Sequence, residues 1–170
     1  KSNPLRPKCH FEQEINSLNR SACEYFFDNS SIAVLGNSHG TELAYALAEE
    51  LRQSSKGILH HTMSGCRHNY KKAGDEQTVC LQWHEKVLEA LSNDESVQTV
   101  VISYRNEQYI EEEEYRRSLV QTIERLFYAN KQVILVLQAP RPGADIHKYI
   151  AQSFFDNSKD MKGITKGDWE

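Results

Sequence analysis

The sequence lacks the features that mark membrane-spanning and nucleic-acid-binding proteins. No apolar run in its 170 residues approaches the length of a bilayer span. Positive charge is not in surplus, because the formal net charge is −4 at pH 7, and this gives no electrostatic reason to bind nucleic acid or an anionic membrane surface. The chain begins at Lys1 without a signal peptide, so we expect an excised domain whose cellular address must come from other features.

Cysteine is scarce, and the four cysteines form no Cys-x-x-Cys motif, which argues against a zinc knuckle and a thioredoxin motif. They occur as two pairs, Cys9 with Cys23 and Cys66 with Cys80, and the second pair brackets a polar loop. Two local disulfides are the favoured arrangement, and four unrelated buried thiols are the alternative. Disulfides persist in oxidising compartments, so their formation would indicate a periplasmic or extracellular location.

Short apolar runs alternate with helical patterns along the chain. We expect strands at 32–35, 58–62, 99–103 and 132–138, and helices at 40–53, 81–92 and 111–129. Near-continuous apolar strands are typical of parallel sheets that are covered on both faces. The fold class is therefore α/β, a three-layer α/β/α sandwich with a doubly wound parallel sheet. We expect residues 31–170 to form this domain and residues 1–30 to form a disulfide-linked N-terminal extension.

The turn after the first of these strands is the candidate site. Residues 36–40 read Gly-Asn-Ser-His-Gly, which fits the nucleophile pattern G-x-S-x-G, and Ser38 falls at the carboxyl end of the strand, where such sheets bind ligands. A hydroxyl there is exposed by the tight turn and lies beside the N–H groups of the following helix. The alternative is that Ser38 or Thr41 only caps that helix.

Four segments in this order resemble the SGNH domains that are fused to acyltransferase-3 membrane proteins. They are "LGNSHG" after the first strand, "MSGC" at 63–66, "VVISYRNEQY" at 100–109 and "LVLQAPRPGADIHKYI" at 135–150. The resemblance spans about residues 9–150, and the cysteine pair before the first segment is also typical of these domains. It implies a flavodoxin-like parallel sheet.

The resemblance also implies roles for individual residues. Ser38 would be the acyl nucleophile, and its own backbone N–H would be one donor of the oxyanion hole. Gly65 would supply a second backbone N–H and Asn106 a side-chain amide. Gly65 is alternatively a turn residue beside a disulfide, and Asn106 alternatively only ends a strand. His39 is interpreted as structural, since its place at the turn is poor for reaching the Ser38 hydroxyl.

Two departures from the family pattern stand out. Asn37 occupies a position where the family usually has Asp, and we expect a modest effect because Asn makes similar hydrogen bonds. More seriously, the family's general base is the His of an Asp-x-x-His element, which this sequence does not contain; the "DIH" at 145–147 has the wrong spacing. We therefore expect the last strand of the sheet and the catalytic loop to be absent from these residues.

The remaining histidines are weaker candidates for a base. They are His60, His61, His68, His84 and His147. Each is more simply explained as an ordinary core or surface histidine, and a zinc site built from the first four has no recognisable ligand spacing. We expect no cofactor and no metal.

The resemblance predicts an O-acyltransferase domain that transfers an acyl group, expected to be acetyl, to a surface glycan through a serine acyl-enzyme. The implied partners are the glycan acceptor, an acyl donor and a covalently linked membrane acyltransferase domain that tethers a periplasmic domain to the inner membrane. One alternative is a carbohydrate O-acyl esterase, in which water accepts the acyl group. Another is a non-catalytic glycan-binding or interaction domain that keeps the fold without the base.

Overall fold

The computed structural model describes residues 3–12, 22–28, 30–68, 79–105 and 111–137. The chain divides into two units, Lys1–Leu137 and Gln138–Glu170, and every described residue belongs to the first. Among the described residues, no helix is long and apolar enough to cross a bilayer.

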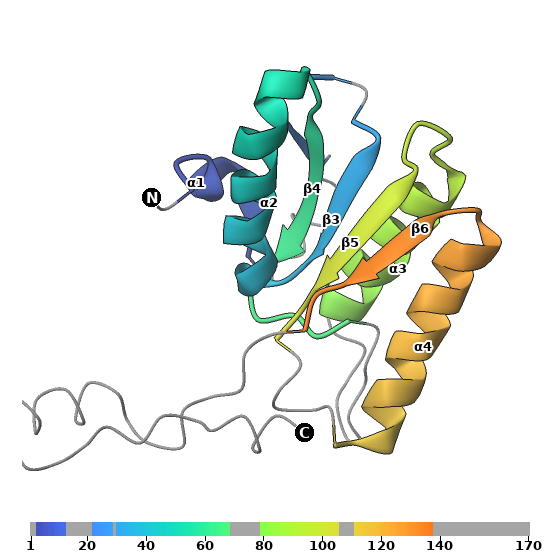
Figure 1. Cartoon of the computed structure of the whole chain (residues 1–170). Helices are drawn as coiled ribbons and strands as arrows, with labels where there is room; N and C mark the ends of the chain where they lie inside the picture. The colour runs from blue at the N-terminus through green and yellow to red at the C-terminus, as the bar shows by residue number, and fades with distance from the viewer. Residues whose placement is uncertain (1–2, 13–21, 29, 69–78, 106–110, 138–170) are drawn as a thin grey trace, which may run out of the picture. The chain divides into compact units, whose positions relative to one another are not determined.

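Six strands in the described part form one sheet, in the order β1-β4-β3-β5-β6, with β2 pairing beside β1 on β4 (Figure 1). The strands are β1 (His10–Phe11), β2 (Cys23–Tyr25), β3 (Ile32–Gly36), β4 (Ile58–Met63), β5 (Thr99–Ser103) and β6 (Gln132–Leu135). All strand pairs are parallel except that of β2 with β4. The carboxyl ends of β3, β4 and β5 therefore meet at one edge.

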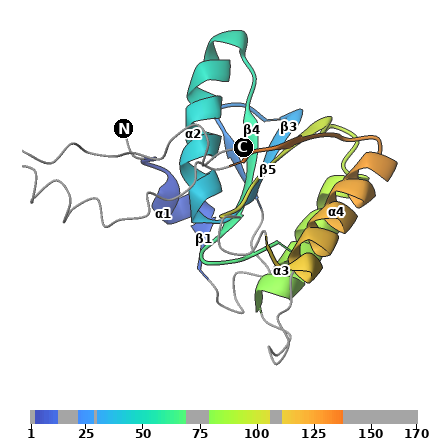
Figure 2. The same cartoon turned by 60° about the horizontal axis from the view of Figure 1, so that its bottom comes forward.

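Helices cover the two faces of this sheet unequally. They are α1 (Arg6–Cys9), α2 (Ser38–Leu51), the short 3-10 helix η2 (Arg52–Ser54), α3 (Val79–Asn93) and α4 (Glu113–Tyr128). Figure 2 shows α2 on one side of the sheet and α3 with α4 on the other. These layers confirm the expected α/β/α sandwich. The expected absence of a final strand concerns residues 138–170, which lie outside the described residues.

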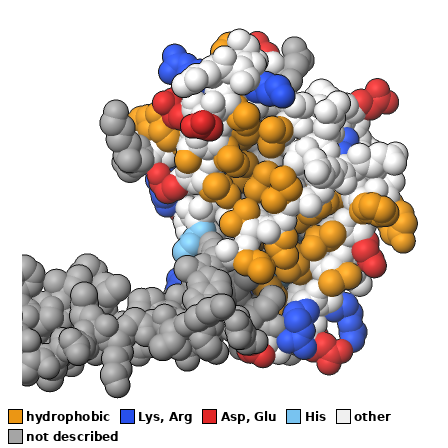
Figure 3. All heavy atoms as spheres, viewed as in Figure 1, with side chains coloured by type: hydrophobic (Ala, Val, Ile, Leu, Met, Phe, Trp, Pro, Cys, Tyr) orange, Lys and Arg blue, Asp and Glu red, His pale blue; other side chains and the backbone are white. Residues whose placement is uncertain are grey.

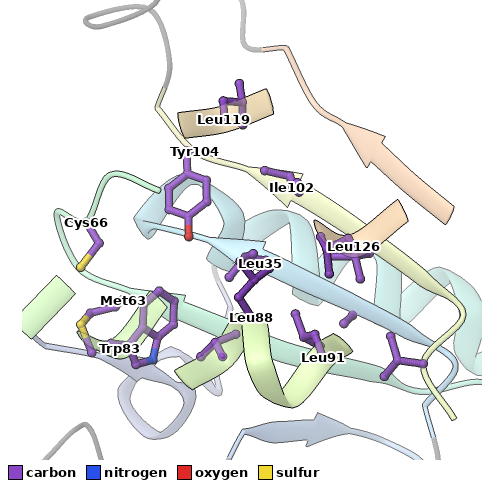
Figure 4. Packing of buried hydrophobic residues seen from close by; sticks show 14 of the residues in the cluster. Leu35, Met63, Cys66, Trp83, Leu88, Leu91, Ile102, Tyr104, Leu119 and Leu126 are labelled. Carbon is purple, nitrogen blue, oxygen red and sulfur yellow. The ribbon is translucent and has the colours of Figure 1, made fainter. Parts of the chain in front are cut away.

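Successive side chains of a strand point to opposite faces of the sheet, and this divides the core into two clusters. Leu35 and Ile102 point toward α3 and α4 and share one cluster with Leu88 and Leu126 (Figure 4). Val34 points the opposite way and belongs to the cluster under α2. Because both faces of β3 are apolar, the strand reads as a continuous hydrophobic run in the sequence, as a buried parallel strand should.

The α2 side of the sheet is less completely covered. Figure 3 shows hydrophobic side chains gathered on this face, across the part of the sheet formed by β5 and β6. Ile134 of β6 pairs with Val101 of β5, and 46% of its surface is exposed. Within the described residues, α2 packs mainly on β3, β4 and part of β5.

The sequence predictions and the structure agree on the main elements. The predicted strands correspond to β3, β4, β5 and β6, and the predicted helices to α2, α3 and α4, with α2 beginning two residues earlier than expected, at Ser38. No pattern indicated β1 and β2, which lie in residues 1–30 and hydrogen-bond to β4. These strands are only two and three residues long, so they carry no periodic signal.

Candidate functional site

The turn from β3 into α2 leaves the Ser38 hydroxyl outside the helix cap. Asn37 is the N-cap residue: its backbone is extended, with φ −109° and ψ −157°, and its Oδ1 accepts a hydrogen bond from the His39 N–H at 3.1 Å. Ser38 is the first helical residue and is half-buried. The hypothesis that Ser38 or Thr41 caps α2 is therefore wrong, because the Asn37 side chain performs that function.

Two glycines allow this turn to pack against the end of β5. A Cβ on Gly36 would lie 2.1 Å from the backbone oxygen of Ser103, and a Cβ on Gly40 would lie 3.1 Å from the same oxygen. The first distance is shorter than any van der Waals contact, so a larger residue at position 36 would force β3 and β5 apart. The close approach of the Ser103 oxygen thus explains why both positions of the G-x-S-x-G pattern are glycine in this structure.

The amide of Asn37 also joins the serine turn to the loop after β4. Its Nδ2 donates to the backbone oxygen of Cys66 at 3.1 Å, while its Oδ1 holds the start of α2. One buried amide side chain therefore links the two segments that carry Ser38 and Gly65. Aspartate, the residue expected from the family, would have no hydrogen to donate to the Cys66 carbonyl when ionised.

Gly65 lies in this loop, next to Cys66, and adopts a left-handed conformation with φ 63°. It is exposed, and Thr62 near the end of β4 pairs with Gly36 at the end of β3. The structure thus places Gly65 and Ser38 on segments that emerge at the same edge of the sheet. Asn106 lies outside the described residues, and its place in the site stays a prediction.

Both predicted disulfides form. Cys9 is bonded to Cys23 with the two Cα atoms 5.5 Å apart, and Cys66 is bonded to Cys80 with the Cα atoms 5.4 Å apart. The second bond ties the loop that carries Gly65 to the start of α3. The alternative of four buried thiols is wrong, and the two bonds fit an extracytoplasmic domain.

The buried histidines carry no charge at neutral pH. Desolvation by burial lowers the pKa of His60, His68 and His84 to about 3 and the pKa of His61 to about 4. No histidine among the described residues hydrogen-bonds to the Ser38 hydroxyl. His147 lies outside the described residues.

The zinc hypothesis fails on the geometry of β4. His60 and His61 are consecutive in this strand, so their side chains point to opposite faces of the sheet. His60 bonds to Tyr25 and Thr62, which places it on the α2 side. The described residues contain no cluster of three or more His, Cys, Asp or Glu that could hold a metal.

One group of residues near the serine turn was not found from the sequence. His10 of β1 and Thr62 of β4 contact Thr41 in the first turn of α2, and all three are buried. Their positions in the sequence are far apart and match no motif, so only the pairing of β1 with β4 brings them together.

Three features together define an SGNH-type α/β domain. They are the largely parallel sheet, the glycine-flanked serine at the start of the first crossover helix, and the loop glycine at the same edge of the sheet. The chain belongs to the family of SGNH domains fused to AT3 domains, whose model matches residues 8–170. No curated protein sequence matches the chain.

The fold is similar to a solved structure, the periplasmic domain of a lipopolysaccharide acetyltransferase from Salmonella ser. Paratyphi A. The TM-score is 0.65 and the sequence identity 12%, and the match covers 97% of this chain and 67% of that chain. At this identity the likeness shows the fold.

Proposed function

We propose that this domain takes part in O-acylation of a surface glycan, with Ser38 as the residue that carries the acyl group. The observation that supports the proposal is that the Asn37 side chain caps α2, so the hydroxyl of Ser38 is not used for capping. The backbone N–H of Ser38 and the dipole of the helix are then available to an oxyanion formed beside Ser38.

The chemistry consists of two acyl transfers. In the first, Ser38 Oγ attacks the carbonyl carbon of the acyl donor; the Oγ–carbon bond forms, the bond to the donor breaks, and the hydroxyl proton passes to a general base. In the second, a sugar hydroxyl attacks the acyl-serine, the ester forms on the sugar, and Ser38 regains its proton. Backbone N–H groups of Ser38 and Gly65, together with the Asn106 amide, stabilise the oxyanion in both steps.

Membership of this family supports the proposed source of the acyl group and the proposed location of the domain. Its members are described as fused to AT3 domains, so we propose that such a membrane domain is covalently linked to this one and delivers the acyl group. The similar solved structure is named as the periplasmic domain of a lipopolysaccharide acetyltransferase, which supports an acetyl group, a glycan acceptor and a periplasmic position here. The two disulfides agree with an oxidising compartment.

The general base decides between this function and a non-catalytic one. The sequence has no Asp-x-x-His element, and no described histidine bonds to Ser38. General-base assistance contributes about 10²–10⁴-fold, so residues 1–170 alone should turn over an activated ester only slowly. Slow turnover still permits one acylation per molecule, which is the event to look for.

The test is acetylation of Ser38 by p-nitrophenyl acetate, followed by intact mass and peptide mapping. We expect a single acetyl group on the peptide that contains Ser38, and none in Ser38→Ala. Ser92→Ala is the matched control, because Ser92 lies on α3 and its Oγ donates to the Leu88 carbonyl. Equal acetylation of wild type and Ser38→Ala would remove Ser38 as the nucleophile and leave the glycan-binding function.

Transfer and hydrolysis are separated by the acceptor. Acetylated protein is mixed with an oligosaccharide or with buffer alone, and the products are separated. Acetyl-sugar that forms faster than free acetate identifies a transferase, whereas release of acetate at a rate independent of the sugar identifies a carbohydrate O-acyl esterase.

A further inference from the structure

A chain of buried polar groups runs from the N-terminal segment to the edge of the sheet that carries Ser38. Asn3 Nδ2 donates to Tyr25 Oη at 2.9 Å, and Tyr25 Oη lies 3.0 Å from His60 Nδ1. His60 Nε2 lies 2.8 Å from Thr62 Oγ1. Each of these residues is at least 96% buried, so every hydrogen bond in the chain is shielded from water.

Asn3 Nδ2 is the fixed donor at one end of this chain. Tyr25 Oη and His60 Nδ1 satisfy each other as a donor and acceptor pair in either tautomer of the ring. His60 is neutral, since burial holds its pKa at about 3, so one of its ring nitrogens carries a hydrogen and the other accepts one. Thr62 Oγ1 is thus joined to the sheet through His60 Nε2 and to α2 through Thr41 Oγ1.

His10 stands at the far end of this chain, against the first turn of α2. Its Nδ1 lies 2.8 Å from Thr62 Oγ1 and 3.0 Å from Thr41 Oγ1, and the two threonine oxygens are 3.0 Å apart. Thr41 is three residues beyond Ser38, and its Oγ1 lies 3.5 Å from the Asn37 carbonyl oxygen. His10 therefore closes a triangle of polar atoms beneath the serine turn.

The N-terminal disulfide holds His10 in this place. Cys9 precedes His10 and is bonded to Cys23 of β2, and both β1 and β2 pair with β4. His10 has only 6% of its surface exposed, and its Nε2 is buried with no hydrogen-bond partner in the part of the chain that the structure describes. Only Nδ1 therefore contributes hydrogen bonds in the described structure, so the contact with α2 depends on that atom alone.

We propose that His10 is a positioning residue of the serine site, which acts through Thr62 and Thr41 to hold the first turn of α2 against the sheet. This inference rests on the proposed function of Ser38. It gives the disulfide-linked N-terminal segment a part in the site, although that segment lies outside every motif of the family resemblance except its cysteine pair.

A displaced first turn would affect catalysis more than binding. This turn carries Ser38, whose backbone N–H is one of the proposed oxyanion donors and acts on charge that develops only in the transition state. Loss of its alignment should therefore lower kcat about tenfold while KM changes little.

The first measurement is backbone amide hydrogen exchange, which needs no activity. His10→Ala should speed exchange of the amides at positions 39–42 roughly tenfold relative to those of α3, because the hydrogen bonds of His10 to Thr62 and Thr41 are lost. His84→Ala is the matched control: it also removes a fully buried imidazole, but on α3. His84→Ala should leave the ratio of the α2 exchange rate to the α3 exchange rate unchanged, or lower it by speeding exchange in α3.

Two conservative variants distinguish Nδ1 from Nε2 and do not depend on the alanine variant folding. Asparagine places a polar atom near the position of Nδ1, and glutamine places one near that of Nε2. His10→Asn should restore slow exchange at positions 39–42 and the rate of Ser38 acetylation, and His10→Gln should restore neither. Rescue by Gln and not by Asn would overturn the proposal, as would equally fast exchange throughout the protein in either variant.

The outcomes for His10 and for Ser38 remain separable. If wild-type Ser38 is not acetylated at all, the proposed function fails, while the exchange data still decide whether His10 holds α2. If Ser38 is acetylated at the same rate in wild type, His10→Asn and His10→Gln, the proposed function stands and the positioning role of His10 is refuted.

Discussion

Acidification from pH 7.5 to 5.5 should strongly destabilise this domain. Four of the five buried histidines among the described residues are held as neutral rings by pKa values of about 3 for His60, His68 and His84 and about 4 for His61. In the unfolded chain each ring regains a pKa near 6.5. Unfolding therefore takes up protons below about pH 6.5, so the free energy of unfolding falls as the pH falls through that value.

The magnitude follows from the difference in proton binding. Between pH 7.5 and 5.5 an unfolded histidine goes from about 10% to about 90% protonated, whereas the buried rings stay neutral. Each ring then removes about 1.4 kcal/mol from the free energy of unfolding, and the four together remove about 5.5 kcal/mol. Since whole domains are stable by only about 5–15 kcal/mol, this is a large fraction.

Urea denaturation at the two pH values, followed by circular dichroism with the disulfides intact, measures the effect. His84→Leu sharpens the test, because neither ring nitrogen of His84 has a hydrogen-bond partner among the described residues and leucine fills much of the same apolar space. This variant should be no less stable than wild type at pH 7.5 and should lose about 1.4 kcal/mol less on acidification.

Val87→Ala on the same helix serves as the control. It deletes buried apolar atoms without changing any titratable group, so it should lower stability equally at both pH values. The reasoning is refuted if wild type loses less than about 1 kcal/mol between pH 7.5 and 5.5, or if His84→Leu leaves that loss unchanged.

Further predictions concern the serine turn and the disulfides. Gly36→Ala should cost about 3 kcal/mol in urea denaturation, because its Cβ would lie 2.1 Å from the Ser103 oxygen; unchanged stability would contradict this packing. Asn37→Asp should speed amide exchange at Cys66 roughly tenfold, since an ionised carboxylate cannot donate to its carbonyl, and equal exchange would remove that link. Alkylation before reduction should label no cysteine, and replacing both Cys66 and Cys80 by serine should cost about 3 kcal/mol.

Much of the fold could be predicted because its signals are local. Apolar runs such as 132–138 and helical stripes such as that of 81–92 arise within one element and depend little on distant residues. The disulfides were predictable for a similar reason, as each joins cysteines 14 residues apart. The place of Ser38 at the end of a buried strand also followed from the local pattern.

The site was less predictable where one side chain decides between two roles. Ser38, Thr41 and Asn37 are all acceptable N-cap residues, and only the geometry shows that the Asn37 side chain receives the His39 N–H. The second contact of Asn37, to Cys66, joins loops 29 residues apart and has no signature in the sequence.

The sequence by itself determined the alternation of β3 to β6 with α2 to α4, the disulfide partners and the serine turn, because each depends on spacing within a short segment. The tertiary structure alone decided that the N-terminal residues 10–11 and 23–25 join the sheet and that His10 reaches Thr41, 31 residues away. Two short strands have no periodicity of their own. Their pairing depends on the free edge and register of β4, and that register determines which polar side chains meet beneath α2.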